Sequence, residues 1–228
     1  MKKFLATTAL VSALACAAPA MAQEEQQCNG NASVGNDTGR LFAKQGLDFY
    51  QGSTGIFDFT LTCGRFYGNL WHAETGFQTF NETDGRLGVT GQITSDLSYD
   101  ASVAIYVIDG PEAYELSGAV TYTINDNWSL KGDIDIIRGG FNTDVFFGEV
   151  RWSDELFGNV SGSASAGVSF DTWSRDTVGH LNLGASIPIW ALTGSASVQG
   201  FTVLEEGNPA LSNDDDAVIG SLSLSYDF

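Results

Sequence analysis

The sequence predicts an all-β protein, a transmembrane antiparallel β-barrel. Three observations support this prediction: a short export signal at the N-terminus, alternation of apolar and polar residues from about residue 40 to the end, and a chain that stops on Phe228. Alternation with a period of two gives each strand one apolar and one polar face. Bacterial outer-membrane barrels carry the apolar face outside and the polar face inside.

The first 22 residues are predicted to be a secretory signal peptide. Two lysines precede an apolar run over 4–17, and the small residues Ala20 and Ala22 mark a cleavage site after Ala22. The apolar run is too short to span a bilayer as a helix. A lipoprotein signal ending at Cys16 is the alternative, but the Leu expected three positions before that Cys is missing. We therefore expect an exported protein of the cell outer membrane.

The mature chain is strongly acidic. The full sequence has 10 Lys and Arg against 28 Asp and Glu, and loss of the two lysines in the signal peptide leaves a net charge of −20. A nucleic-acid partner is excluded because it requires a basic face. No stretch after residue 22 is apolar and long enough for a transmembrane helix. A closed barrel is the other structure that satisfies every backbone group in lipid.

Nine alternating segments follow residue 85. In the clearest of them, apolar residues occupy one face, and the other face is mostly Ser, Thr, Asn and charged residues. A soluble β-sandwich has the same period, but its apolar face normally carries more bulk and its turns more Pro. The clearest apolar series run over Leu97–Val107, Tyr114–Ile124, Trp128–Ile136, Val160–Phe170, Leu181–Ile189 and Val218–Phe228.

The last of these segments carries a further signal. Its apolar face ends in Tyr226 and Phe228. A terminal strand that ends in Phe resembles the signal by which bacterial outer-membrane proteins are recognised for barrel insertion. This resemblance implies that the barrel-assembly machinery is a partner of the strand. Outer-membrane lipid and lipopolysaccharide are the other partners that such a barrel implies.

Short and long connections alternate along the chain. The short ones are predicted at 94–96, 125–127, 153–155 and 190–191, and the long ones at 80–85, 109–113, 139–143, 171–176 and 204–216. Outer-membrane barrels have short periplasmic turns and long outer loops, so this alternation predicts the sidedness. Aromatic residues at the same end predict a girdle at the periplasmic interface, formed by Trp128, Trp152, Trp190, Tyr226 and Phe228.

The predicted number of strands is twelve. Three segments, at 40–50, 56–62 and 66–75, precede the nine that follow residue 85. The runner-up is ten strands, with the first two segments forming a plug or a periplasmic hairpin. An even number places both termini in the periplasm. Residues 23–39 are then a periplasmic tail, and 40–228 form the barrel.

Two cysteines remain after cleavage, Cys28 and Cys63. The oxidising periplasm and the even count favour a disulfide between them. In the twelve-strand arrangement Cys28 lies in the tail and Cys63 in the first turn, both on the periplasmic side. The predicted bond ties the tail to the barrel.

Two short motifs resemble a family of exported proteins. Phe66-Tyr67-Gly68-Asn69-Leu70-Trp71, followed by an alternating hairpin and then Ala113-Tyr114-Glu115-Leu116, is similar to porins of the Gcw_chp/TorF type. The similarity covers about 46–137. The family's N-terminal Ser-Asp-Tyr and Arg-Gly stretch is not recognisable in 39–52. The resemblance implies a barrel and no particular substrate.

Charged residues on the polar faces are predicted to project into the lumen. Their excess of carboxylates favours cations in a pore, so the predicted function is a passive, cation-preferring channel for small solutes. The alternative is a structural or interaction barrel with functional outer loops, whose lumen is filled by ion pairs, because twelve strands is near the size at which an interior is either plugged or just open. The predicted lumen charges are Asp58, Asp100, Glu115, Lys131, Asp133, Asp135, Glu149 and Arg151.

The sequence predicts no enzyme, metal or cofactor. Barrels that cleave lipids use a Ser nucleophile and a His base at the lipid-facing rim. Of the two histidines, His180 is expected to face inward and His72 has no Ser near it in the sequence. No metal-ligand spacing, phosphate loop or dinucleotide fingerprint occurs. The acidic run 214–216 is interpreted as a solvated loop, with divalent ions that bridge lipopolysaccharide as the alternative.

Overall fold

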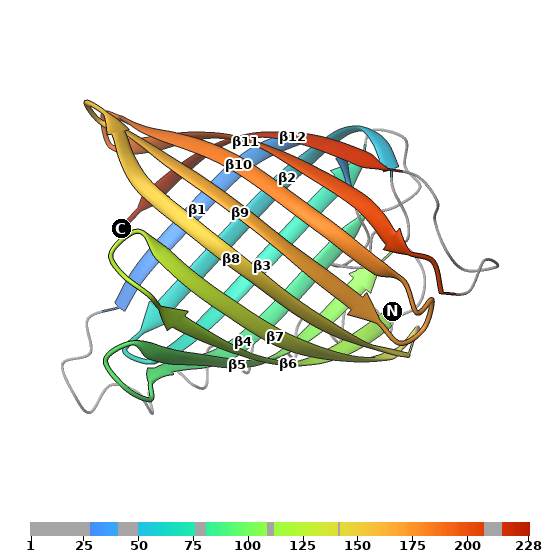
Figure 1. The fold of residues 1–228 in the computed structure, drawn as a ribbon. Helices are drawn as coiled ribbons and strands as arrows, with labels where there is room; N and C mark the ends of the chain where they lie inside the picture. The colour runs from blue at the N-terminus through green and yellow to red at the C-terminus, as the bar shows by residue number, and fades with distance from the viewer. Residues whose placement is uncertain (1–27, 41–49, 76–80, 109–111, 141, 208–215) are drawn as a thin grey trace, which may run out of the picture.

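The protein is a closed antiparallel barrel of twelve strands in the computed structural model (Figure 1). The structure describes residues 28–40, 50–75, 81–108, 112–140, 142–207 and 216–228. Each strand pairs with its neighbours in the chain, and β1 pairs with β12 to close the barrel. The strands are β1 (Cys28–Arg40), β2 (Tyr50–Cys63), β3 (Phe66–Thr75), β4 (Glu82–Gln92), β5 (Leu97–Ile108), β6 (Glu112–Thr123), β7 (Trp128–Gly139), β8 (Thr143–Phe157), β9 (Val160–Asp171), β10 (Thr177–Ile189), β11 (Leu192–Glu205) and β12 (Ala217–Asp227).

The predicted strand faces are confirmed. On β6 the side chain of Leu116 is 54% exposed on the outside, whereas Glu115 beside it is 7% exposed and faces inward. The outer surface consists mainly of such exposed apolar residues, which fits lipid because water would penalise so large an apolar area. Buried apolar residues are few: Ala113, Ile137 and Val145 form a small cluster near the loop end. None of the described segments is a helix long and apolar enough to cross a bilayer.

Short turns join the strands at one end of the barrel, and the longer connections lie at the other. The predicted turn at 153–155 is wrong, because β8 runs through it to Phe157 and the turn follows at Gly158, which has a φ of +57°. Ser, Asp and Glu resemble a turn in composition, but Ser153 pairs with Ser163 on β9. The predicted loop 80–85 is too long for the same reason, since β4 already begins at Glu82.

The first strand differs from the prediction. It spans Cys28–Arg40, not 40–50, so the predicted tail 23–39 is part of the barrel from Cys28 onward. Residues 41–49 and the predicted signal peptide lie outside the described residues. Strand β1 is rich in Asn and Gly, which have low strand propensity, and its alternation is therefore weak. Because β1 and β2 pair within the barrel, the ten-strand alternative is excluded.

The predicted disulfide is present between Cys28 and Cys63. Its setting is different from the one expected, because the two cysteines are paired residues at the ends of β1 and β2, with Cα atoms 4.2 Å apart. The bond therefore staples two neighbouring strands and does not tether a tail.

Candidate functional site

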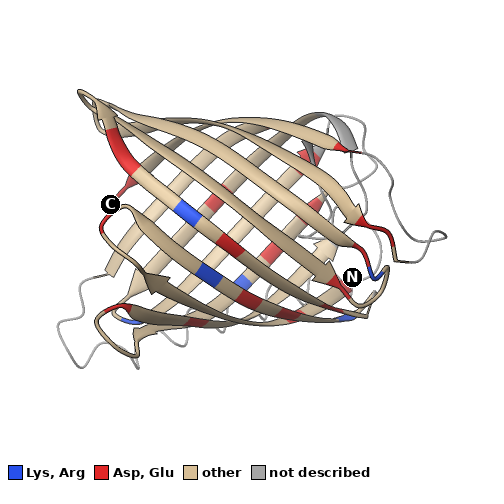
Figure 2. Cartoon of the chain, in the orientation of Figure 1, with Lys and Arg blue, Asp and Glu red and all other residues tan. Residues whose placement is uncertain are grey.

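The interior of the barrel is the candidate site, and the predicted charges lie on its inner face. They occur on β2, β5, β6, β7 and β8, where they alternate with the outward apolar residues (Figure 2). Asp100, Glu115, Asp133 and Asp135 line one lumen cavity, Glu149 lines another, and Lys131 and Arg151 line both. Asp58 accepts a hydrogen bond from Asn69 at 3.2 Å.

The structure also places four charged residues on the inner face that are not among the predicted lumen charges. Glu82, Asp84 and Arg86 on β4 and Asp37 on β1 line the larger cavity. Glu82 and Asp84 fall in the predicted loop, and Asp37 falls in the predicted tail. Strand alternation is the signal that predicts an inward position for three of them. Charged residues at 82, 84 and 86 alternate there with Thr83, Gly85 and Leu87.

Arg86 is the centre of a network that joins β4, β5 and β6. Its guanidinium contacts Glu115 at 2.7 Å and donates hydrogen bonds to Ser102 at 2.7 Å and Tyr106 at 3.2 Å. The hydroxyl of Tyr106 donates to the other oxygen of Glu115. Charge-assisted bonds of this kind are the strong ones in a low-dielectric interior. The network fixes three strands and holds Arg86 in place.

The other two basic side chains of the inner wall are also paired. Lys131 contacts Asp133 at 2.7 Å, and Arg151 contacts Glu149 on the same strand. Lys131 also lies 6.0 Å from the ring centre of Phe147. All three cations therefore sit beside carboxylates, so the wall formed by β4 to β8 is an interleaved set of both signs.

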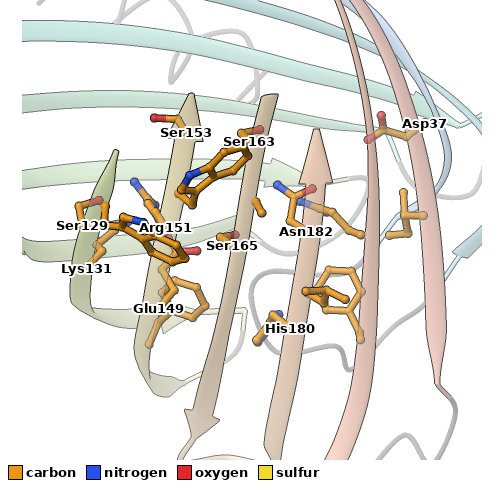
Figure 3. A pocket seen from close by; sticks show the side chains of 18 of the residues that line it. Asp37, Ser129, Lys131, Glu149, Arg151, Ser153, Ser163, Ser165, His180 and Asn182 are labelled. Carbon is orange, nitrogen blue, oxygen red and sulfur yellow. Dashed lines mark hydrogen bonds and ion pairs between the residues drawn. The ribbon is translucent and has the colours of Figure 1, made fainter. Parts of the chain in front are cut away.

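The wall formed by β9 to β12 is neutral along its middle. Figure 2 shows no charge on the central parts of β9, β10 and β11. Register pairs on the inner face are polar and uncharged, as in Asn182 with Gln199 and Ser186 with Ser195. In Figure 3, Ser163, Ser165 and Asn182 continue the inner surface beside the charged pair on β8. The lumen thus has one charged and one neutral wall.

Two cavities occupy the described lumen. The larger has a volume of about 990 Å³ and is lined from the turn end by Ser129 and Ser163 and from the loop end by Glu82 and Ile219. The second cavity, of about 930 Å³, opens near Arg65 at the turn end. The residues that line both cavities are Arg86, Tyr106, Lys131, Ile137 and Arg151.

The residues of the predicted girdle lie at the turn end of the barrel. Trp128 and Trp152 are register partners on β7 and β8. Trp190 is 97% exposed in the turn between β10 and β11, with a φ of 58°. Tyr226 and Phe228 stack with ring centres 6.0 Å apart. The five aromatic side chains therefore lie at the same end of the barrel. That they contact a membrane interface stays a prediction.

The two histidines face opposite sides of the barrel wall. His180 faces the lumen, where its Nε2 lies 2.7 Å from the hydroxyl of Ser169. Ser169 is 3% exposed and, unlike His180, lines neither lumen cavity. His72 faces outward and contacts Thr83 at 2.9 Å. Within the described residues no group of three or more His, Cys, Asp or Glu is arranged to hold a metal ion.

Comparison with solved structures shows the same fold. The KdgM porin superposes with a TM-score of 0.62 at 8% identity, covering 87% of this chain and 99% of that chain, and a second KdgM structure is in complex with disordered oligogalacturonate. The NanC porin superposes with a TM-score of 0.58 at 4% identity, covering 86% and 98%. The COG4313 outer membrane channel from Pseudomonas putida F1 superposes with a TM-score of 0.52 at 8% identity, covering 91% and 97%.

No protein-family model and no curated protein sequence matches this chain. At these identities the likeness concerns the fold alone, which is that of outer-membrane β-barrels. Because no family model matches, the resemblance to Gcw_chp/TorF-type porins rests on the two motifs alone. Phe66–Trp71 lies on β3, and Ala113–Leu116 lies on β6.

Proposed function

We propose that the protein is an outer-membrane channel for the passive, cation-preferring passage of small polar solutes. The observation that carries this proposal is the larger lumen cavity, because residues from both ends of the barrel line it. An apolar outer face and a polar inner face suit a barrel in a bilayer. The proposal includes export, with cleavage after Ala22, and passive transport without catalysis.

The charge of the lumen supports the preference for cations. Nine carboxylates and four basic side chains line the two cavities in the described part of the chain. The side chains that line the cavities therefore carry a net charge of −5. Carboxylates around a narrow polar path favour cations. We further propose that lipid and lipopolysaccharide surround the barrel and that the barrel-assembly machinery binds β12. We also propose that the protein is one of the Gcw_chp/TorF-type porins.

The conductance of the purified protein in a planar bilayer tests this proposal. We expect discrete current steps, and a reversal potential in a KCl gradient whose sign shows K⁺ preference. The variants Glu115→Ala and Asp133→Ala should reduce that preference. Current steps with chloride preference would contradict the cation assignment, and the absence of steps at any voltage would contradict the channel.

A barrel with a filled lumen is the second candidate. The network of Arg86, Tyr106 and Glu115 favours it, because these groups bond to one another across three strands. In that case the outer loops carry the function. A folded, heat-modifiable protein that conducts nothing would support this candidate.

A further inference from the structure

A row of three aromatic rings lies near the loop end, where the charged wall meets the neutral wall. Phe147 on β8, His180 on β10 and Phe201 on β11 face the larger lumen cavity, and each is half-buried. The ring centres of Phe147 and His180 are 5.4 Å apart, and those of His180 and Phe201 are 5.1 Å apart. Each phenyl ring stands nearly perpendicular to the imidazole, at 81° and 83°.

The row is held in position by its neighbours. His180 and Phe201 are register partners, and the contact with Ser169 fixes the imidazole. Lys131 lies over Phe147 on the side toward the charged wall. The rings are therefore anchored to the barrel wall while all three line the larger cavity.

Uncharged hydrogen-bonding side chains continue from the row toward the turn end. The next inward pair is Asn182 with Gln199, and Ser165 pairs with Asn182 on its other side. These three side chains line the same cavity, and Figure 3 shows Ser165 and Asn182 on its wall. The following position is Gly184, which pairs with Ser197 and Ser163. Amide and hydroxyl groups both donate and accept hydrogen bonds, so this surface suits a ligand with many hydroxyls.

We propose that the aromatic row, with Ser165, Asn182 and Gln199, is a binding site for uncharged polyhydroxylated solutes, such as sugars, on their way through the lumen. The C–H faces of a sugar pack on aromatic rings, and its hydroxyls bond to the amides and serines beyond them. This mixture of apolar lining and a few placed polar groups is typical of small-molecule sites. This inference rests on the proposed channel and names its solute class.

The charges of the lumen argue for a neutral ligand. Glu149 and Arg151, the nearest charged pair on β8, are bonded to each other, and Lys131 is bonded to Asp133. A carboxylated sugar would meet the surplus of lumen carboxylates without a spare cation on the neutral wall. The solute class therefore differs from the oligogalacturonate with which a KdgM porin structure was solved.

Block of the ion current by two trisaccharides of equal size tests the site. Neutral maltotriose should reduce the current of the full-length protein in a planar bilayer, and anionic trigalacturonate should do so at least tenfold more weakly. Phe147→Leu and Phe201→Leu keep a bulky apolar side chain but remove a ring. A contact between two aromatic side chains is worth ~0.5–1.5 kcal/mol. A ring–sugar contact of the same size predicts a ~2- to 13-fold rise in the blocking concentration of maltotriose when the ring is removed.

The matched controls are Phe146→Leu and Phe170→Leu, because these two rings lie on the outer face, 6.5 Å apart. They should leave the block by maltotriose unchanged. Equal effects of inner and outer variants, or stronger block by trigalacturonate, would overturn the site.

Binding measured on the folded protein separates this site from the channel. If the protein conducts no current, titration calorimetry on the detergent-solubilised barrel still measures whether maltotriose binds at the site. If maltotriose binds and Phe201→Leu weakens that binding, the proposed site stands and only the proposed channel is overturned. No heat of binding, with or without conductance, would overturn the site itself.

Discussion

Phe228, the last residue, closes the barrel on Gly30 of the first strand. The Gly30 amide donates to the Phe228 carbonyl at 2.7 Å, and the Phe228 amide donates to the Gly30 carbonyl at 2.9 Å. The ring of Phe228 lies so close over Gly30 that a Cβ there would overlap it. It also lies 6.1 Å from the ring of Phe59 on β2. The terminal aromatic thus covers the seam between β1 and β12.

Replacing Gly30 with Val should weaken the seam. The added side chain displaces the ring of Phe228, and overpacking of this kind costs ~1–3 kcal/mol. Urea unfolding of the purified barrel, followed by its heat-modifiable mobility on gels, measures the loss. Gly200→Val is the matched control, because Gly200 on β11 has open space around the position of a Cβ. Similar losses for both variants would show that the ring over Gly30 does not matter.

Removing the disulfide should lower the stability without preventing barrel formation. Cys28 and Cys63 are 35 residues apart in the sequence, and closing a loop of that length stabilises a fold by ~3–4 kcal/mol in the chain-entropy model. The double variant Cys28→Ser/Cys63→Ser should therefore unfold at lower urea concentration than the oxidised protein, and reduced wild type should match it. An unchanged unfolding midpoint would contradict the prediction.

The sequence predicts the later part of the barrel better than its beginning. From Leu97 onward the alternation is strong because Val, Leu, Ile and Tyr mark the outer face. In β1 the outer face carries Gly30, Ala32 and Asn36, which do not mark a lipid-facing strand. The pairing that makes Cys28–Arg40 a strand comes from β2 and from the C-terminal strand, and such contacts are distant in sequence.

The lumen charges on β5 to β8 follow directly from strand parity, because a residue's face is fixed once its strand is known. The bonds among them do not follow. Arg86 meets Glu115 across an intervening strand, and that pairing depends on the register and on the length of Arg86. The aromatic row depends in the same way on the register of β8, β10 and β11. Periodicity alone predicts that Phe147 and Phe201 face inward, but it does not predict that their rings contact His180.

Arg86 and Glu115 should depend on each other for stability. The Glu115 side chain is 5% exposed and that of Arg86 is 28% exposed. Arg86→Met leaves the buried carboxylate of Glu115 without its cation. Loss of one member of a buried ion pair costs ~3–5 kcal/mol of folding free energy. Because Arg86 is partly exposed, we expect a loss at or below the lower end of that range. The double variant Arg86→Met/Glu115→Gln should regain much of the loss. Additive losses in urea unfolding would show that the two side chains do not act as a pair.

The same two positions should shift the ion selectivity in opposite directions. Arg86→Gln removes a positive charge from the boundary of both lumen cavities, so the preference for K⁺ over Cl⁻ should rise. Glu115→Gln removes a negative charge and should lower it. The reversal potential in a KCl gradient measures both shifts. Glu74→Gln is the control, because Glu74 is exposed on the outer face of β3.

Salt provides a second check on the origin of these shifts. The Debye length falls from about 10 Å at 0.1 M to about 3 Å at 1 M ionic strength, so both shifts should shrink as the KCl concentration rises. A shift that keeps its size in 1 M salt would indicate a change in pore geometry, because screening acts on charge alone. Shifts of the same sign for Arg86→Gln and Glu115→Gln would contradict an electrostatic role for the lumen wall.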